Sequence, residues 1–128
     1  MEAVAELTAQ SVLTSDFLDS PEAGPLLEQM RSTFGEIPPD AYIATIEATK
    51  DADLGPDLSR ITAPTLVING EFSTNSPVDT GPQGIGGRGI ANGIRGGRLE
   101  VIKGARHLVM MERFEEVCGL IIDFLKEQ

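Results

Sequence analysis

Cysteine and histidine each occur only once in this sequence, which limits its chemistry. Cys118 is the single cysteine of the 128 residues, and His107 is the single histidine. One cysteine cannot form a disulfide within the chain, which agrees with a reducing compartment. One cysteine and one histidine are also too few ligands for a zinc site, so we expect no bound metal.

Long apolar runs are lacking as well. No run approaches the roughly 20 residues that a membrane-spanning helix needs. The first residues are acidic and helical in pattern, rather than basic and then apolar. The sequence therefore predicts neither contact with a membrane nor a secretory signal, and it favours a cytoplasmic location.

Positive charge is scarce, above all in the first half of the chain. The formal net charge is −10, with twelve acids and three bases in residues 1–60 and eight acids and seven bases in residues 61–128. Such an acidic chain repels phosphate backbones, so we do not expect a nucleic acid as a partner. Solvated helix faces account for the acidity.

The first sixty residues have the apolar spacing of helices. Residues 1–13 form the first expected helix, Gly35 ends the second, and Pro38-Pro39-Asp40 opens the third, since proline is tolerated in a first helical turn. Residues 51–57 are expected to form a linker. The residues expected on buried helix faces are Val4, Leu7, Val12, Leu27, Met30, Phe34, Tyr42, Ile43 and Ile46.

The pattern changes at Pro64, beyond which two short apolar runs predict strands. Residues 65–69 form a continuous apolar run, typical of a strand buried on both faces of a parallel sheet, and residues 98–103 form the second run. A weak helix is expected between them in the glycine-rich residues 81–97, and a last helix from Glu112 to the end. This order of strand, helix, strand and helix predicts an α/β fold with a parallel pair.

Both helices of this half should bury apolar side chains against the sheet. Interior glycines cost the first of them about 0.5–1 kcal/mol each relative to alanine. Its residues expected to face the sheet are Ile85, Ile90 and Ile94. Those expected to be buried by the last helix are Phe114, Val117, Cys118, Ile121, Ile122 and Leu125.

Two parallel strands are too few to cover each other's edges. The strand at residues 65–69 would expose a very apolar edge, and such edges promote aggregation. We therefore expect neighbouring strands to be missing from this chain. They would come from a partner chain, from a longer polypeptide, or from a homodimer that pairs the exposed edges.

The second half carries a composite motif. The segment ITAPTLVING (residues 61–70) is followed about thirty residues later by GARH (residues 104–107), then by Glu112 and an apolar helix ending in IIDFL (residues 121–125). This resembles the last two strands of α/β-hydrolases, with I-x-x-P-T-L-V-I-x-G, then G-A-x-H and a closing amphipathic helix. The resemblance covers residues 57–128 and implies a partial α/β-hydrolase fold.

The first half adds a narrower likeness. Residues 1–5, 42–44 and 51–54 resemble the helical cap of 3-oxoadipate enol-lactonases and their relatives. The resemblance implies a helical cap-like segment at residues 1–56 and the C-terminal βαβα part of the core at residues 57–128. It also implies hydrolysis of a small-molecule ester or lactone, with no cofactor.

The same resemblance implies roles for individual residues. His107 stands where the family has its general base, a role that suits histidine because its usual pKa of about 6.5 lets it exchange protons near neutrality. The acid should follow the earlier strand as G-x-x-D, but Ser73 occupies that place. Asp79 is an alternative acid if the loop folds back, whereas Glu71 lies too close to the strand end.

The nucleophile of the family is absent from these residues. No G-x-S-x-G, the strand-turn-helix elbow that exposes the catalytic serine, occurs in the sequence. Two interpretations follow. The chain is the C-terminal part of a hydrolase that needs a complementing N-terminal half and is inactive alone, or it is a non-catalytic remnant or interaction module.

One further motif is a chance match. The segment GIGGRG (residues 84–89) fits the dinucleotide-binding pattern G-x-G-x-x-G, but it does not directly follow a strand, as that motif must. We therefore expect no nicotinamide cofactor. Cys118 lies on the apolar face of the last helix and is expected to be a core residue rather than a nucleophile.

Overall fold

The computed structural model of the chain describes residues 1–80 and 84–128. Helices dominate the first half: α1 (Glu2–Val12), α2 (Ser15–Leu18), α3 (Ala23–Glu36), α4 (Pro39–Thr49) and the 3₁₀-helix η1 (Gly55–Arg60). The second half alternates strands and helices: β1 (Leu66–Gly70), α5 (Gly87–Gly93), β2 (Arg98–Ile102), α6 (Val109–Glu112) and α7 (Phe114–Lys126). The predicted α/β order is therefore confirmed.

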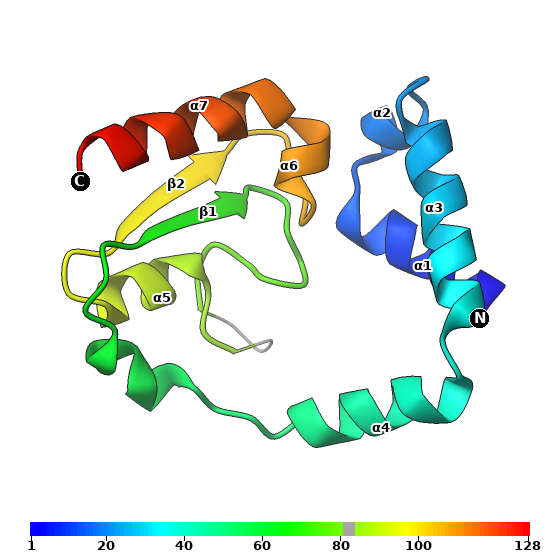
Figure 1. The fold of residues 1–128 in the computed structure, drawn as a ribbon, viewed down its shortest axis with the longest axis horizontal. Helices are drawn as coiled ribbons and strands as arrows, with labels where there is room; N and C mark the ends of the chain where they lie inside the picture. Colours follow the sequence, from blue (N-terminus) through cyan, green and yellow to red (C-terminus); the bar gives the residue numbers. More distant parts are fainter. Residues whose placement is uncertain (81–83) are drawn as a thin grey trace.

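The two strands form a parallel sheet. Leu66 pairs with Arg98 at one end and Gly70 with Ile102 at the other. Figure 1 shows α7 on one face of this sheet and α5 on the other. Under α7 lies a core of buried apolar side chains, with half-buried neighbours packed against it: Ile68, Ile102, Ala105, Val109, Val117 and Leu120.

The glycine-rich helix α5 forms in spite of its composition. Ile94, just beyond its end, is buried, and Ile90 within it is half-buried, as expected. Ile85 precedes the helix and is exposed, so its predicted burial is wrong. Part of the expected helical segment, residues 81–83, lies outside the described residues.

The sheet is open at both edges. Within the described ranges, neither strand pairs with a third one. Leu66, Val67 and Ile68 are only half-buried, and Val101 is exposed. The exposed edge expected from the sequence is therefore present, and the homodimer that would cover it stays a prediction.

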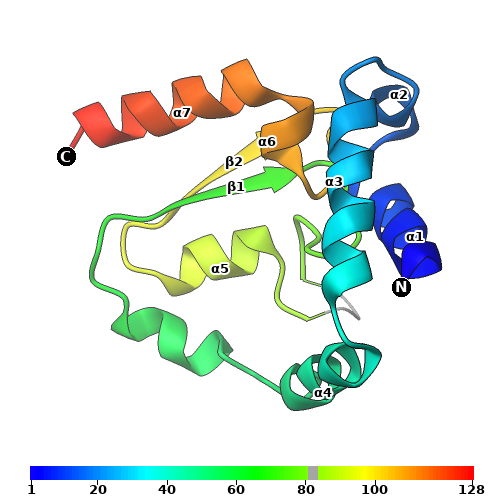
Figure 2. The same cartoon turned by 45° about the vertical axis from the view of Figure 1, so that its right-hand side comes forward.

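The N-terminal helices build a second core around Leu13, which is fully buried. Figure 2 shows α1 and α3 side by side, and Leu27 and Met30 of α3 pack on this core, as predicted. Leu7 is exposed, which contradicts its prediction, because α1 turns Ala5, Ala9 and Val12 inward instead. The prediction that Gly35 ends the second helix is also wrong, because α3 continues through Gly35 to Glu36.

Helix α4 runs between the two halves along one side of the molecule (Figure 1). It starts at Pro39, as expected. The ring of Tyr42 lies 6.2 Å from that of Phe34, measured between centroids. Ile43 and Ile46 are exposed, however, so their predicted burial is wrong. The apolar spacing of α4 marks a face that no described element covers.

The C-terminal helix departs most from its prediction. Arg113, with φ −138° and ψ 51°, separates α6 from α7, so the expected single helix is two. Of the six residues predicted to be buried, Val117 is buried and Cys118 half-buried, whereas the others are exposed: Phe114, Ile121, Ile122 and Leu125. The physical reason is width, since a sheet of two strands covers only part of the apolar face of α7.

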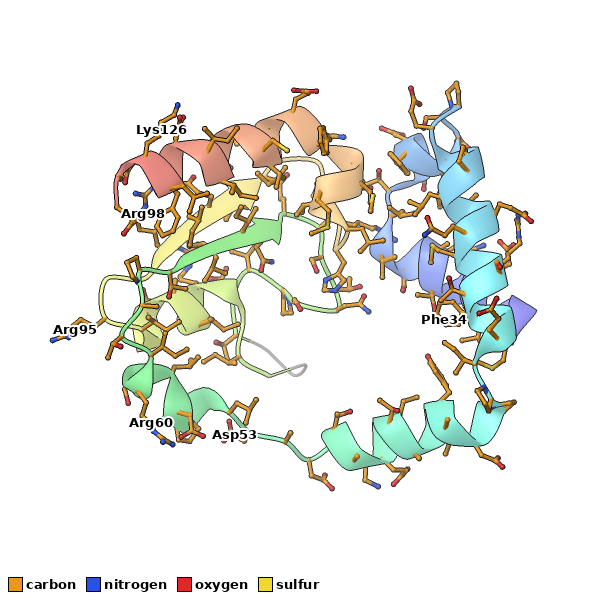
Figure 3. The ribbon with its side chains drawn as sticks, viewed as in Figure 1. Phe34, Asp53, Arg60, Arg95, Arg98 and Lys126 are labelled. Carbon is orange, nitrogen blue, oxygen red and sulfur yellow. The ribbon has the colours of Figure 1, made fainter. Side chains whose placement is uncertain are left out.

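The labelled charged residues Arg60, Arg95 and Lys126 lie at the periphery of the molecule (Figure 3). Arg60 pairs with Asp57 at 2.8 Å, and Arg98 pairs with Glu127 while its guanidinium lies 5.4 Å from the ring centre of Phe124. Exposed pairs of this kind contribute about 0–1 kcal/mol each. The two apolar cores therefore hold the fold together. None of the helices in the described part is long and apolar enough to cross a membrane.

Candidate functional site

His107 lies in the turn that follows β2. Gly104, in the left-handed region at φ +65°, turns the chain away from the strand. The backbone N–H groups of His107 and Leu108 then both donate to the carbonyl oxygen of Val12, each at 3.0 Å. The histidine is half-buried and is held against the C-terminal end of α1.

Ser73 lies in the corresponding turn after β1. Its backbone N–H donates to the carbonyl oxygen of Gly70 at 3.1 Å, and the residue is buried, with 6% of its surface exposed. Its Oγ lies 3.2 Å from Nδ1 of His107 and accepts the backbone N–H of Ser76, also at 3.2 Å. The structure thus brings together the residues that the resemblance assigned to the base and the acid position.

Asp79, the alternative acid, is engaged elsewhere. Its carboxylate pairs with Nε of Arg88 at 2.7 Å, and its side chain is 75% exposed. The neighbouring carbonyl oxygens of Pro77 and Val78 accept N–H groups from Gly87 and Arg88, which fixes this segment to the start of α5. Among the described residues, Asp79 has no hydrogen bond to His107.

Glu71 also has a structural partner. Its Oε2 accepts the backbone N–H of Gly104 at 2.9 Å, so the carboxylate stabilises the turn before the histidine. This contact links the ends of β1 and β2. The expectation that Glu71 does not serve as the acid stays a prediction.

Glu112 has a role that the sequence did not reveal. The residue is buried, with 8% of its surface exposed, and its carboxylate accepts backbone N–H groups from Thr14 and, at 2.6 Å, from Arg106. It therefore links the residues that follow α1 to the residue that precedes His107. Its place five residues after His107 in the motif was the signal that could have pointed to it.

Glu112→Gln is expected to destabilise the chain by about 1–3 kcal/mol. The amide keeps one acceptor oxygen, but its NH₂ group faces a backbone N–H, which leaves two donors opposed. Urea denaturation followed by circular dichroism measures the loss. Glu115→Gln, on the exposed start of α7, is the matched control and should change stability by less than about 0.5 kcal/mol. Equal stabilities of the two variants would contradict the role of Glu112.

A small cavity of about 160 Å³ opens beside the histidine. Asn69, at the end of β1, donates from Nδ2 to the carbonyl oxygen of Ser76 at 2.7 Å and so holds one wall in place. The residues that line the cavity are Ile68, Asn69, Gly70, Ser73, Ser76, Ile90 and His107. Neither of its serines lies in a nucleophile elbow.

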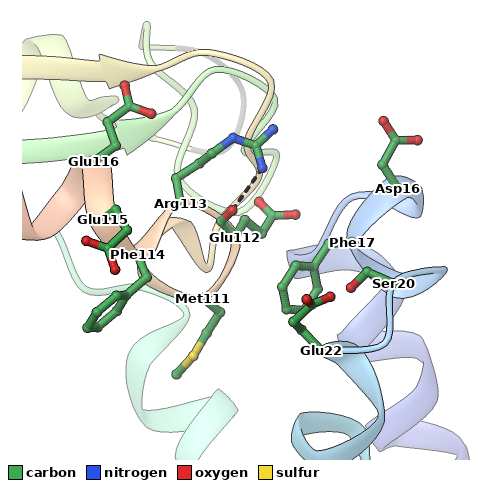
Figure 4. A pocket seen from close by; sticks show the side chains of 10 residues that line it. All are labelled: Asp16, Phe17, Ser20, Glu22, Met111, Glu112, Arg113, Phe114, Glu115 and Glu116. Atoms are coloured by element: carbon green, nitrogen blue, oxygen red, sulfur yellow. Dashed lines mark hydrogen bonds between the residues drawn. The ribbon is translucent and has the colours of Figure 1, made fainter.

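A larger cavity, of about 540 Å³, lies elsewhere, between α2 and the α6–α7 junction (Figure 4). Phe17, Met111 and Phe114 give it apolar walls, and Asp16 and Glu22 give it an acidic rim. It includes neither Ser73 nor His107, so we place the candidate chemistry in the smaller cavity. No group of acidic, histidine or cysteine side chains within residues 1–80 and 84–128 could hold a metal ion.

The parallel pair β1–β2, the helices on its two faces and the contact between His107 and Ser73 are what is expected of the C-terminal half of an α/β-hydrolase. Solved structures agree with this class. The chain superposes on an enol-lactonase from Burkholderia xenovorans LB400 and on a hydrolase from Pseudomonas aeruginosa PA01, each with a TM-score of 0.81 and 28% identity over 98% of this chain. This chain also matches an esterase from Thermogutta terrifontis, with a TM-score of 0.75 and 26% identity over 98% of this chain.

The chain spans less than half of these proteins: 45%, 44% and 43% of their respective lengths. The predicted partial α/β-hydrolase fold and the likeness to enol-lactonases are therefore confirmed. No protein-family model and no curated protein sequence matches the chain. The roles assigned to His107, Ser73 and Asp79 stay predictions.

Proposed function

We propose that this chain is the C-terminal part of a hydrolase of carboxylic esters or lactones, similar to enol-lactonases, and that it is inactive without a separate nucleophile. The observation that carries the proposal is the 3.2 Å contact between His107 and Ser73 at the carboxyl ends of two parallel strands. A general base and its orienting partner occupy this place in the fold. The likeness to an enol-lactonase and to an esterase supports the reaction class.

The proposed mechanism divides the work between two segments. A serine on a G-x-S-x-G elbow, supplied by a complementing N-terminal half, attacks the carbonyl carbon while His107 accepts its proton. The histidine then returns the proton to the leaving oxygen, and water releases the acyl group by the same steps. The open edges of the β1–β2 sheet and the exposed face of α7 are where the complementing half would pack.

This chain lines one part of the proposed site, the cavity of about 160 Å³ beside His107. The structural relatives include an enol-lactonase and an esterase with bound malate, a small dicarboxylate. A carboxylated lactone or ester is therefore the substrate class that we propose.

Hydrolysis of p-nitrophenyl acetate tests this function. The chain is assayed alone and together with the part of the Burkholderia enol-lactonase that lies outside the matched 45%. We expect no turnover above background from the chain alone. The mixture should release p-nitrophenol, and His107→Ala should abolish that release. Turnover by the chain alone that depends on His107 would contradict the proposed lack of a nucleophile.

A second candidate is a non-catalytic remnant or interaction module of hydrolase ancestry. Ser73 favours it, because a neutral hydroxyl cannot stabilise an imidazolium by charge as a carboxylate does. The two candidates differ in the mixture of the chain with the complementing half. If the two co-elute in gel filtration but hydrolyse no ester, the result supports this candidate over the first.

A further inference from the structure

The hydroxyl group of Ser73 has few partners. A serine hydroxyl offers one proton and two lone pairs. The backbone N–H of Ser76 donates to one lone pair at 3.2 Å, and the remaining neighbour within hydrogen-bond distance, among the described residues, is Nδ1 of His107. Ser73 is only 6% exposed although it lines the small cavity, whereas His107 is half-buried, so water reaches the ring more readily than the hydroxyl group.

Two arrangements of the proton are open to this pair. If Nδ1 carries a proton, it donates to Ser73, and the hydroxyl proton then has no protein acceptor in a buried position. If Nδ1 is bare, it accepts the hydroxyl proton, and the hydrogen left without a protein partner is the one on Nε2 of the half-buried ring. A buried donor without an acceptor is costly, whereas an unused lone pair costs less.

We propose that Ser73 donates its hydroxyl proton to Nδ1 and thereby holds neutral His107 in the tautomer protonated at Nε2. The second ring nitrogen has no hydrogen-bond partner among the described residues, and the ring lines the small cavity. In this tautomer the histidine presents a donor rather than a lone pair. It binds an acceptor oxygen, such as that of a carboxylate or carbonyl group, and Nε2 can take a proton from a nucleophile only in the minority of molecules that have the proton on Nδ1.

The proposal deepens the proposed function, because it concerns the same histidine. An aspartate at position 73 would have only acceptor oxygens, so it would bind the opposite tautomer, with the proton on Nδ1. The lone pair of Nε2 would then be free to act as a base. Ser73 is thus a positioning residue. Its hydroxyl donates to Nδ1, whereas an aspartate at the same position would accept a proton from Nδ1.

Nitrogen-15 NMR of the full chain reads the tautomer without any reaction. His107 is the single histidine, so selective labelling gives one ring. Long-range proton–nitrogen spectra recorded at about pH 9, well above the usual pKa of histidine, identify the protonated nitrogen. Ser73→Asp is the test variant. Ser76→Ala is the matched control, because Ser76 takes part through its backbone N–H.

We expect the wild-type ring to be protonated at Nε2 over Nδ1 by at least about fivefold. Ser76→Ala should leave this ratio unchanged, and Ser73→Asp should reverse it. A wild-type ring protonated mainly at Nδ1 would overturn the proposal, even if the aspartate variant fails to fold. The ester assay has no bearing on this result, so the failure of one proposal is distinguishable from the failure of the other.

Discussion

Ser73→Asp is expected to raise the ester turnover of the complemented chain by up to about 10⁴-fold. In serine proteases, loss of the charge at the orienting acid costs about this factor, because the histidine then takes the wrong tautomer. Ser73→Asp makes the opposite change, because it adds a charge at this position. A carboxylate at position 73, beside Nδ1 of His107, would orient the ring and stabilise the imidazolium formed during attack.

The measurement is the rate constant for p-nitrophenyl acetate hydrolysis by the complex at saturating complementing half. Ser73→Asn is the matched control, because it has nearly the volume of aspartate without its charge. It should gain less than about tenfold, since a neutral amide does not stabilise an imidazolium. Equal gains from both substitutions would show that charge at this position is unimportant, and no gain from aspartate would favour the non-catalytic module.

The strands could be predicted from the sequence almost to the residue. The run at residues 65–69 became a strand at Leu66–Gly70, and its partner ended at Ile102 rather than at residue 103. A short continuous apolar run between Pro64 and a polar loop leaves little choice of structure. Local pattern and tertiary context agree in this half of the chain.

Burial was harder to predict than secondary structure. The apolar period of α7 correctly marks one face, yet Ile122 and Leu125 on that face are exposed. Periodicity shows which residues a helix can bury, but it carries no information on what is present to cover them. The same holds for Ile43 on α4. None of the described residues covers either of these exposed faces.

The candidate site, too, could be predicted only in part from the sequence. The carboxyl ends of adjacent parallel strands lie at one edge of a sheet, so the proximity of Ser73 to His107 followed from the motif order. The role of Glu112 did not, because its partners are backbone N–H groups of Thr14 and Arg106. Backbone donors have no sequence signature, and Thr14 is 98 residues away along the chain.

Gly70→Ala is expected to destabilise the chain by more than about 4 kcal/mol, which is exceptional for a single methyl group. A Cβ atom at this position would lie 1.8 Å from the carbonyl oxygen of Arg106 and 2.7 Å from that of Ala105. Both atoms belong to the backbone, so no side-chain rotation relieves the overlap. The end of β1 and the turn before His107 touch directly, and only glycine allows this approach.

Gly119→Ala provides the matched control within the same chain. Gly119 lies inside α7, and a Cβ there has no neighbour within 4 Å, so alanine should stabilise the helix by about 0.5–1 kcal/mol. Urea denaturation of the two variants should therefore shift the midpoint in opposite directions. A Gly70→Ala protein within about 1 kcal/mol of wild type would mean that the strand end and the turn separate at little cost. In that case the 3.2 Å spacing between Ser73 and His107 would not be fixed by the backbone either, because both residues extend from these two segments.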